Sequence, residues 1–330
     1  MDPLTQGLVG AVVSESVADR KKVALAGLLG CLSGMAPDLD VLIQSSEDSL
    51  LFLEYHRQFT HSLIFIPFGA LVCAALLFPF VRKRLKWAHV YLFCLLGYAT
   101  HGLLDSCTSY GTQLLWPFSD YRVAWNNISI VDPLFTVPLL AVAIAAARRK
   151  SPRLARAACM FAIGYLLIGV AQRERAEAVG QAVASERGHD VRSVDAKPAF
   201  GSLLLWKTFY EHDNQYYVDA VRVGFSTTRY PGQSIAKLDV ASALPWLRPG
   251  SQQARDLERF RWFSNGFLAA DPERSDHVID IRYSMRPDRI DPMWGIRLSP
   301  TATLRDFAHF YTERDLSPRD RSEVLRMIFE

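Results

Sequence analysis

Three histidines and three aspartates stand at the ends of apolar stretches of the chain: His56, His61, His101, Asp38, Asp40 and Asp105. His101 and Asp105 are four residues apart, so on a helix they share one face and lie about 6 Å from each other. Both side chains could then reach one metal ion. Imidazole and carboxylate ligands without thiolate suit Zn²⁺, Mn²⁺ or non-haem iron.

We predict a divalent metal ion, with Zn²⁺ as first choice, held by Asp40, His61, His101 and Asp105. Such an ion lowers the pKa of a bound water towards neutrality and polarises a phosphoryl or carbonyl oxygen, as in metal hydrolases. The cluster has more donors than one tetrahedral ion needs. Either two ions share them, or some act as a base or orient a histidine ring. We expect such catalytic roles for Asp38, His56 and Asp132.

Each of these residue types also has a purely structural interpretation. A single histidine in an apolar helix is more often a hydrogen-bonded core residue, and we interpret His89 in this way because it adjoins a basic loop. Asp38 and Asp40 could cap the start of a helix. Asp132 followed by Pro133 resembles an N-cap with proline at the first helical position. The metal site is the favoured interpretation because several candidate ligands occur together.

The segment 106–131 is rich in aromatic residues and has two interpretations. One is a belt of aromatic side chains at the membrane interface. The other is a lid over the metal site, in which Tyr110 and Trp116 hold an acyl chain or ring and Arg122 holds a phosphate or carboxylate. Arg57, between the two histidines of the HRQFTH stretch, is a further candidate for substrate binding.

Residues 1–171 hold only 14 of the 37 Lys and Arg and 11 of the 34 Asp and Glu of the chain. About twenty apolar residues cross the 30 Å hydrocarbon core of a bilayer as a helix, and Ser62–Val81 is such a stretch without a charge. Further candidate spans are Leu4–Ala18, Val23–Ile43, Trp87–Leu104, Pro133–Ala147 and Leu154–Ala171. We therefore predict a membrane-embedded helical bundle of about five to six spans over residues 1–171.

Basic residues concentrate in three short loops, 19–22, 82–86 and 148–156. Such loops remain on the cytoplasmic side of a membrane. With six alternating segments, this predicts a multi-pass protein of the inner (plasma) membrane with both termini outside. The candidate ligands and the segment 106–131 then fall on the outer face, towards the periplasm or exterior, where lipids are the first partners that they meet.

Residues 172–330 are polar and are predicted to form a small soluble α+β domain with an antiparallel sheet on the outer face. The expected strands are 203–210, 215–223, 278–283 and 293–298, and the expected helices are 174–186, 252–263 and 317–329.

Composition also excludes several classes of protein. A net charge of +3, confined to short loops, argues against nucleic-acid binding. The five cysteines lie in or beside apolar stretches without CxxC spacing, and we interpret them as buried apolar side chains. The first 13 residues lack the charged start and the cleavage site of a secretory signal, so we expect them to be retained. No feature of the sequence indicates a particular protein partner.

Five motifs together resemble the YdjM-like family of inner-membrane-associated, metal-dependent hydrolases, also described as LexA-binding: MDPLTQGLVGA at 1–11, PDLD at 37–40, HRQFTHS at 56–62, HGLLDSCTSYGTQLLWPFS at 101–119 and DPLF at 132–135. The resemblance implies a multi-span membrane protein with metal-dependent hydrolase activity on an unassigned substrate. Family members commonly have histidine where this chain has Gln6, so this chain has one candidate ligand fewer.

We thus expect a membrane-bound hydrolase that activates water at the His/Asp site and acts on a phosphoester or a lipid-linked substrate. A second hypothesis is a transporter in which the same cluster relays protons or cations. A third is a scaffold without enzymatic activity, in which the metal is structural and its ligand shell is closed.

Overall fold

The computed structural model describes residues 1–330, which form two compact units. The first, here called the helical unit, comprises Met1–Leu42 and Tyr55–Ala171. The second, here called the sheet unit, comprises Ile43–Glu54 and Gln172–Glu330. The segment 43–54 therefore belongs to the sheet unit although the helical unit flanks it in sequence, a feature that the predicted boundary after residue 171 did not include.

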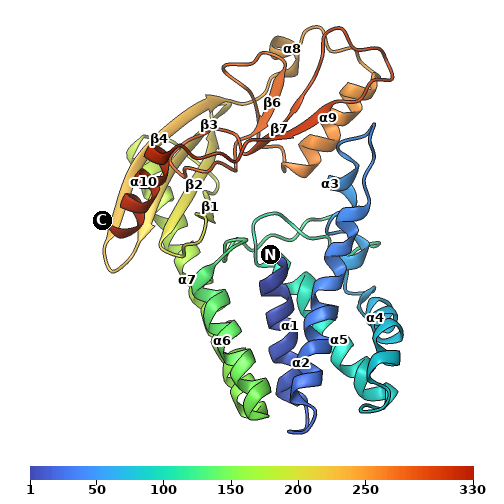
Figure 1. Cartoon of the computed structure of the whole chain (residues 1–330). Coiled ribbons are helices and arrows are strands. Elements are labelled where there is room, and N and C mark those ends of the chain that lie inside the picture. Colours follow the sequence, from blue (N-terminus) through green and yellow to red (C-terminus); the bar gives the residue numbers. More distant parts are fainter. The chain divides into compact units, whose positions relative to one another are not determined.

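Six helices build the helical unit: α1 (Pro3–Val17), α2 (Val23–Met35), α4 (Ile66–Val81), α5 (Trp87–Ser106), α6 (Pro133–Arg149) and the first part of α7 (Pro152–Glu186). Helix α1 packs against α2, α5 and α6, and α5 also packs against α2 and α4 (Figure 1). Buried apolar side chains form two clusters, one that includes Phe93 and one that includes Phe135. Helix α1 is thus surrounded by other helices, which explains why its few polar residues are buried.

Close packing of α1, α2 and α5 depends on glycine. A Cβ atom on Gly30 would lie 2.3 Å from the carbonyl oxygen of Gly10, and one on Gly97 would lie 2.3 Å from the carbonyl oxygen of Gly30. Any larger residue would push the helices apart, and small residues at such crossings are typical of membrane helices.

The number of helices suited to crossing a membrane is smaller than the sequence predicted. Two segments are long and apolar enough, Val23–Leu42 and Pro152–Glu186, and a third results if the bent pair Leu51–His61 and Ile66–Val81 is one span. Helices α1, α4 and α6 have 15, 16 and 17 residues, which is short of a full crossing. Helix α5 has 20 residues but carries two histidines and an aspartate. The prediction of five to six spans is therefore not supported.

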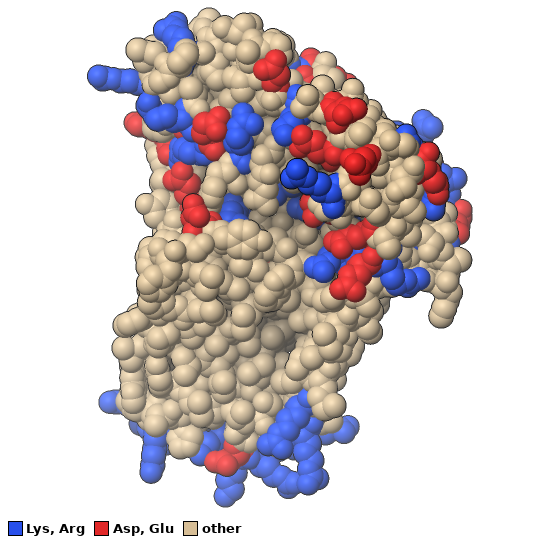
Figure 2. Space-filling view, turned by 180° about the vertical axis from the view of Figure 1, so that it is seen from behind, with Lys and Arg blue, Asp and Glu red and all other residues tan.

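Most of the basic residues of the helical unit gather at one end. The connections α1–α2, α4–α5 and α6–α7 carry them, and all three lie at the same end of the unit (Figure 1). In Figure 2 most charged side chains at this end are blue, and on the face shown the surface next to it has no charged side chains. The helices thus alternate in direction, with one charged end and an apolar band beside it.

The sheet unit contains two antiparallel four-stranded sheets, each with its strands in sequence order. The first sheet consists of β1 (Asp195–Pro198), β2 (Leu205–His212), β3 (Gln215–Val223) and β4 (Thr227–Ala236). The second consists of β5 (Leu268–Ala270), β6 (His277–Asp280), β7 (Trp294–Arg297) and β8 (His309–Thr312). The helices of the unit are α3 (Leu51–Tyr55), α8 (Val240–Ala243), α9 (Gln252–Phe263) and α10 (Pro318–Phe329).

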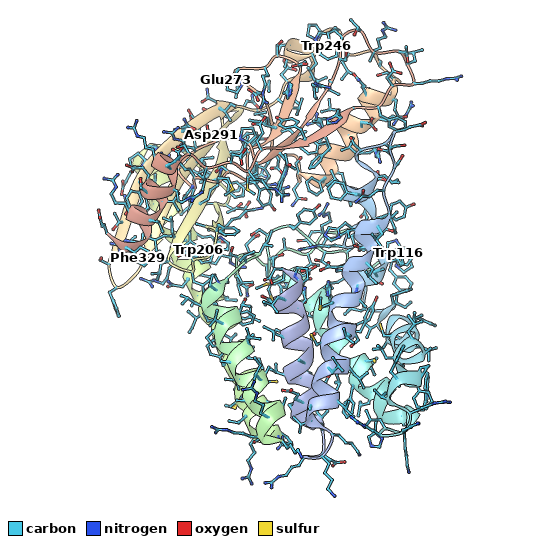
Figure 3. The ribbon with its side chains drawn as sticks, in the orientation of Figure 1. Trp116, Trp206, Trp246, Glu273, Asp291 and Phe329 are labelled. Carbon is cyan, nitrogen blue, oxygen red and sulfur yellow. The ribbon has the colours of Figure 1, made fainter.

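The two sheets share one apolar core. Phe209 and Tyr216 of the first sheet pack with Ile279 of the second, and Trp206 is fully buried in the first sheet (Figure 3). A domain built on antiparallel strands, expected from the sequence, is confirmed. The sequence missed β4, because Pro231 and Gly232 within it are unfavourable in strands, and it missed the short strands β1, β5 and β8.

Candidate metal centre

The candidate ligands lie on two 3₁₀ turns that interrupt helices and on the last turns of α5. Helix α2 continues into a 3₁₀ turn, η1 (Ala36–Leu42), which holds Asp38 and Asp40. A second 3₁₀ turn, η2 (Phe59–His61), ends at His61, and the chain bends by 85° between the helix before it and α4. The last two turns of α5 supply His101 and Asp105. Irregular backbone in such an apolar region is tolerated where it is enclosed by protein.

Four side chains converge at this point: Asp38, His61, His101 and Asp105. One donor atom from each lies within 4.8 Å of all the others, and three of the four residues are buried. The Nε2 atoms of His61 and His101 are 2.9 Å apart. Oδ1 of Asp38 lies 3.3 Å from Nε2 of His101 and 3.6 Å from Nε2 of His61.

The second ring nitrogen of His101 fixes its tautomer. Nδ1 of His101 lies 2.5 Å from the carbonyl oxygen of Gly34, which can only accept a hydrogen bond. Nδ1 therefore carries the proton, and in the neutral ring Nε2 has a free lone pair directed at the cluster.

His61 is oriented in the same way. Its Nδ1 atom lies 3.2 Å from Oδ2 of Asp40 and 2.9 Å from Oγ1 of Thr60. The Thr60 hydroxyl donates to Oδ2 of Asp40 over 2.8 Å, so it accepts from the His61 ring. Nε2 of His61 then also presents a lone pair to the cluster. A carboxylate behind a histidine is the usual arrangement for a metal-binding imidazole.

This donor set fits a cation. Two ring nitrogens with free lone pairs face each other over 2.9 Å and are joined by carboxylate oxygens of Asp38 and Asp105. With both rings in their neutral forms, four acceptor atoms face one another, an arrangement that a positive charge among them would stabilise. Oδ2 of Asp105 is buried and has no partner in hydrogen-bond geometry, although it lies 3.3 Å from Nε2 of His61 and 3.0 Å from Nε of Arg57.

Asp40 lies behind the cluster. Besides His61 and Thr60, it accepts from Nδ1 of His56 over 2.7 Å and from the backbone N–H of Arg57 over 3.1 Å. Both of its oxygens are thus occupied by donors of the protein. Asp38, Asp40 and His56 also place atoms that could bind a metal within 4.8 Å of one another, so the cluster continues towards His56.

Arg57 and Gln6 both bind Asp105. Nε of Arg57 lies 3.0 Å from Oδ2 of Asp105, and its NH1 group donates to Oγ1 of Thr108 over 2.9 Å. Nε2 of Gln6 donates to Oδ1 of Asp105 over 2.8 Å, and the amino group of Met1 also contacts this oxygen. Arg57 has a φ of 66°, a left-handed conformation that non-glycine residues rarely adopt. The Arg57 guanidinium is therefore paired with Asp105 and Thr108, and its role in substrate binding stays a prediction.

A glycine allows His61 to reach α5. A Cβ atom on Gly102 would lie 2.3 Å from the carbonyl oxygen of His61, so only glycine permits this approach. The HGLLD motif thus provides the side chains of His101 and Asp105, and its glycine leaves space for His61. The sequence pattern indicated the two side chains but not the role of the glycine.

Asp132 is engaged elsewhere. Its Oδ1 atom accepts from the backbone N–H groups of Leu134 and Phe135 at the start of α6, and the Tyr165 hydroxyl donates to both of its oxygens. These are the contacts of a helix N-cap, the structural interpretation that the sequence had left open.

The predicted substrate-binding residues Arg57, Tyr110 and Arg122 lie together, the last two in the segment 106–131. The guanidinium groups of Arg57 and Arg122 lie 4.8 and 5.1 Å from the centre of the Tyr110 ring. Arg122 donates to the carbonyl oxygen of Tyr110 over 2.8 Å and is buried. Burial raises the pKa of the Tyr110 phenol, and the two arginines partly offset this rise. Trp116, labelled in Figure 3, lies next to η2, with its ring centre 6.2 Å from that of Phe59.

The family that matches this chain covers its N-terminal half. The sequence profile of the YdjM inner membrane protein family matches residues 1–176, which includes every residue of the cluster. Over 136 residues the chain is 32% identical to the uncharacterized protein YfhP of Bacillus subtilis (strain 168), a match that covers 41% of each chain. Over 108 residues it is 34% identical to the inner membrane protein YbcI of Escherichia coli (strain K12), which covers 31% of this chain and 60% of YbcI.

The chain therefore spans less than two thirds of the length of these two relatives. No solved structure matches it.

Proposed function

We propose that this chain, which belongs to the YdjM inner membrane protein family, is a membrane-bound hydrolase whose His/Asp cluster binds a divalent metal ion. One observation carries the proposal: the Nε2 atoms of His61 and His101 face each other over 2.9 Å inside the helical unit, and the Nδ1 atom of each ring is engaged by the protein. With both rings neutral, two lone pairs flanked by carboxylate oxygens form a site that a cation would stabilise.

The donor set favours Zn²⁺, with Mn²⁺ or Fe²⁺ as alternatives, because it contains nitrogen and oxygen but no sulfur. When bound, the ion would supply an acidified water and a Lewis acid. In this proposal Asp38 takes the ligand position that we predicted for Asp40. Asp40 orients His61 from behind instead, because donors of the protein already occupy both of its oxygens.

His56 is our candidate for proton transfer. Its Nδ1 atom lies 2.7 Å from Oδ1 of Asp40, which fixes the ring and leaves Nε2 to accept and release a proton. Its side chain is 16% exposed, whereas those of His61 and His101 are fully buried, so among the three it is the one that water reaches. The ring of His56 lies 5.9 Å from that of His61, close to the cluster.

The substrate class that we propose is a phosphoester or a lipid-linked molecule. His101 and Asp105 lie at the end of α5 opposite to the basic α4–α5 connection, so the site is near one end of the apolar band. If basic loops face the cytoplasm, this end faces the periplasm or exterior. A reporter fused after residue 40 or residue 110 tests this orientation, and a cytoplasmic signal from either would reverse it.

Metal content tests the site directly. We expect about one divalent ion per detergent-purified wild-type chain by mass spectrometry, and loss of the ion in His101→Ala and Asp105→Asn. His89→Ala is the matched control, because His89 lies on the same helix but contacts Lys22 at the opposite end. Absence of metal from the wild type, even after reloading, would contradict the proposal.

The distance of 2.9 Å between the two Nε2 atoms also suits a shared proton, which favours a proton relay as the second candidate function. A metal-free wild type together with proton flux in liposomes, abolished in His101→Ala, would support that function. Hydrolysis of phosphoester or lipid substrates by the metal-loaded protein, lost in His56→Ala with the metal retained, would support the first.

A further inference from the structure

Apolar side chains project from one end of the first sheet. Phe225 forms the tip of the β3–β4 hairpin and is fully exposed, and Phe200 and Leu204 in the β1–β2 connection are 61% and 40% exposed. These three residues are here called the apolar tip. The two connections are neighbours, because the N–H of Val223 donates to the carbonyl oxygen of Leu204 over 2.7 Å.

The C-terminal helix brings a further aromatic residue to this end of the sheet. Phe329 in the last turn of α10 is 76% exposed (Figure 3). Arg222, the last but one residue of β3, donates to the carbonyl oxygen of Glu330. Aromatic and aliphatic side chains from three separate segments are therefore exposed together, which is uncommon on a surface that faces only water.

Hydrogen bonds join the apolar tip to α7. Nε2 of Gln172 donates to the carbonyl oxygens of Leu203 and Val223, over 3.2 and 2.6 Å. One turn later, Arg175 donates to the carbonyl oxygen of Gly224 over 2.7 Å and to Oε1 of Gln172 over 2.6 Å. Both connections that carry the apolar tip are thus held by the turn of α7 that begins at residue 172.

That turn follows directly on a candidate span. Helix α7 is continuous from Pro152 to Glu186, and its residues 152–171 form the apolar part. Twenty helical residues extend for about 30 Å, the thickness of the hydrocarbon core of a bilayer. Residue 172, where charged residues begin, therefore falls at the level of the lipid headgroups.

We propose that the apolar tip is a membrane-interface anchor, in which Phe225, Phe200 and Leu204 enter the boundary between headgroups and acyl chains. The partner is the lipid surface itself. Neither of the segments 199–204 and 222–226 contains an acidic residue, and Arg222 and Arg175 add positive charge beside them, which suits anionic headgroups. This inference depends on α7 as a span and not on the metal centre.

Photo-crosslinking of the full chain tests the anchor. Benzoylphenylalanine replaces Phe225 in one variant and Asn214 in the other, and each is reconstituted into vesicles of phosphatidylethanolamine and phosphatidylglycerol. Asn214 is the matched control because it is an exposed turn residue at the opposite end of β3. The nine residues of β3 separate the two positions by about 30 Å.

We expect irradiation to increase the mass of the Phe225 variant by that of one lipid molecule and to leave the Asn214 variant unchanged. Equal lipid labelling of both positions, or of neither, would overturn the proposal. A crosslinked dimer from position 225 would also overturn it, because a second copy of the chain would then cover the apolar tip. Phe225→Asp leaves the helical unit unaltered. It should lower the lipid labelling of a benzoylphenylalanine placed at Phe200.

Discussion

At the scale of single residues, Asp38 and Asp40 differ in what surrounds them although they are only two positions apart. In a 3₁₀ turn with three residues per turn, positions i and i+2 point in different directions. Asp38 faces the two Nε2 atoms of the histidine pair, and Asp40 faces Nδ1 of His61 and Nδ1 of His56. Under the proposed function, Asp38 would bind the ion and Asp40 would orient its ligands.

The two carboxylates should respond differently to substitution. Asp40→Asn removes an acceptor from His61, His56 and Thr60, and we expect the affinity for the metal to fall by about 10- to 100-fold while the ion is still bound at saturation. Asp38→Asn should abolish stoichiometric binding. Competition with a chelator measures both affinities. Loss of the ion in Asp40→Asn but not in Asp38→Asn would restore the ligand set that the sequence predicted.

At the scale of helices and strands, the sequence predicted chemistry better than geometry. Charged and imidazole side chains stand out in an apolar context, so the cluster of His61, His101 and Asp105 was recognisable. Whether a stretch is one straight span or a helix broken at a 3₁₀ turn depends on tertiary packing, as in the bend before α4. The approach of His61 to Gly102 depends on that bend, and no local pattern encodes it.

Strand pairing in the sheet unit has an energetic consequence that the sequence also did not show. Lys197 of β1 and Lys207 of β2 are directly opposite each other, and both are buried. Burial lowers the pKa of Lys207 to about 7, and it lowers the pKa of Lys197, with a further decrease from Arg282. Nζ of Lys207 donates to Oγ of Ser284 and to the carbonyl oxygen of Arg289, which a neutral amine can also do.

The free energy of unfolding should therefore rise with pH above 7. An unfolded lysine has a pKa of about 10.4, so between pH 7 and pH 10 the unfolded chain binds a proton that the folded Lys207 has lost. This one group contributes a slope of up to about 1.4 kcal/mol per pH unit, and the destabilisation is complete below pH 7.

Lys207→Met removes the group that takes up this proton on unfolding. The slope should therefore fall by up to about 1.4 kcal/mol per pH unit, and the contribution of Lys197 should remain. Urea titrations of the full chain in detergent at pH 7, 8 and 9, followed by near-ultraviolet circular dichroism, measure the effect. Identical slopes for the wild type and the variant would show that Lys207 remains charged in the folded state.

At the scale of the whole molecule, a segment of the sheet unit separates, along the chain, two parts of the candidate metal centre. The segment 43–54 follows η1, which carries Asp38 and Asp40, and precedes His56, yet it is part of the sheet unit. Arg259 of α9 holds this segment. Its guanidinium donates to both oxygens of Asp48 over 3.0 and 2.9 Å and to Oε1 of Glu54 over 2.5 Å.

Because Arg259 binds Asp48 and Glu54 of this segment, we predict that the sheet unit influences metal binding without contributing a ligand. Arg259→Ala leaves Asp48 and Glu54 without their guanidinium partner and should destabilise the sheet unit by about 2 kcal/mol. Because η1 and His56 are joined by the freed segment, the affinity for the metal should also fall.

Arg261→Ala is the control, since Arg261 lies on the same helix and pairs only with the exposed Glu258 at the surface. Chelator competition and urea titration of both variants separate the two effects. Reduced stability of Arg259→Ala with unchanged metal affinity would mean that the segment is only a tether, whereas a loss of both would make the sheet unit a determinant of the metal centre.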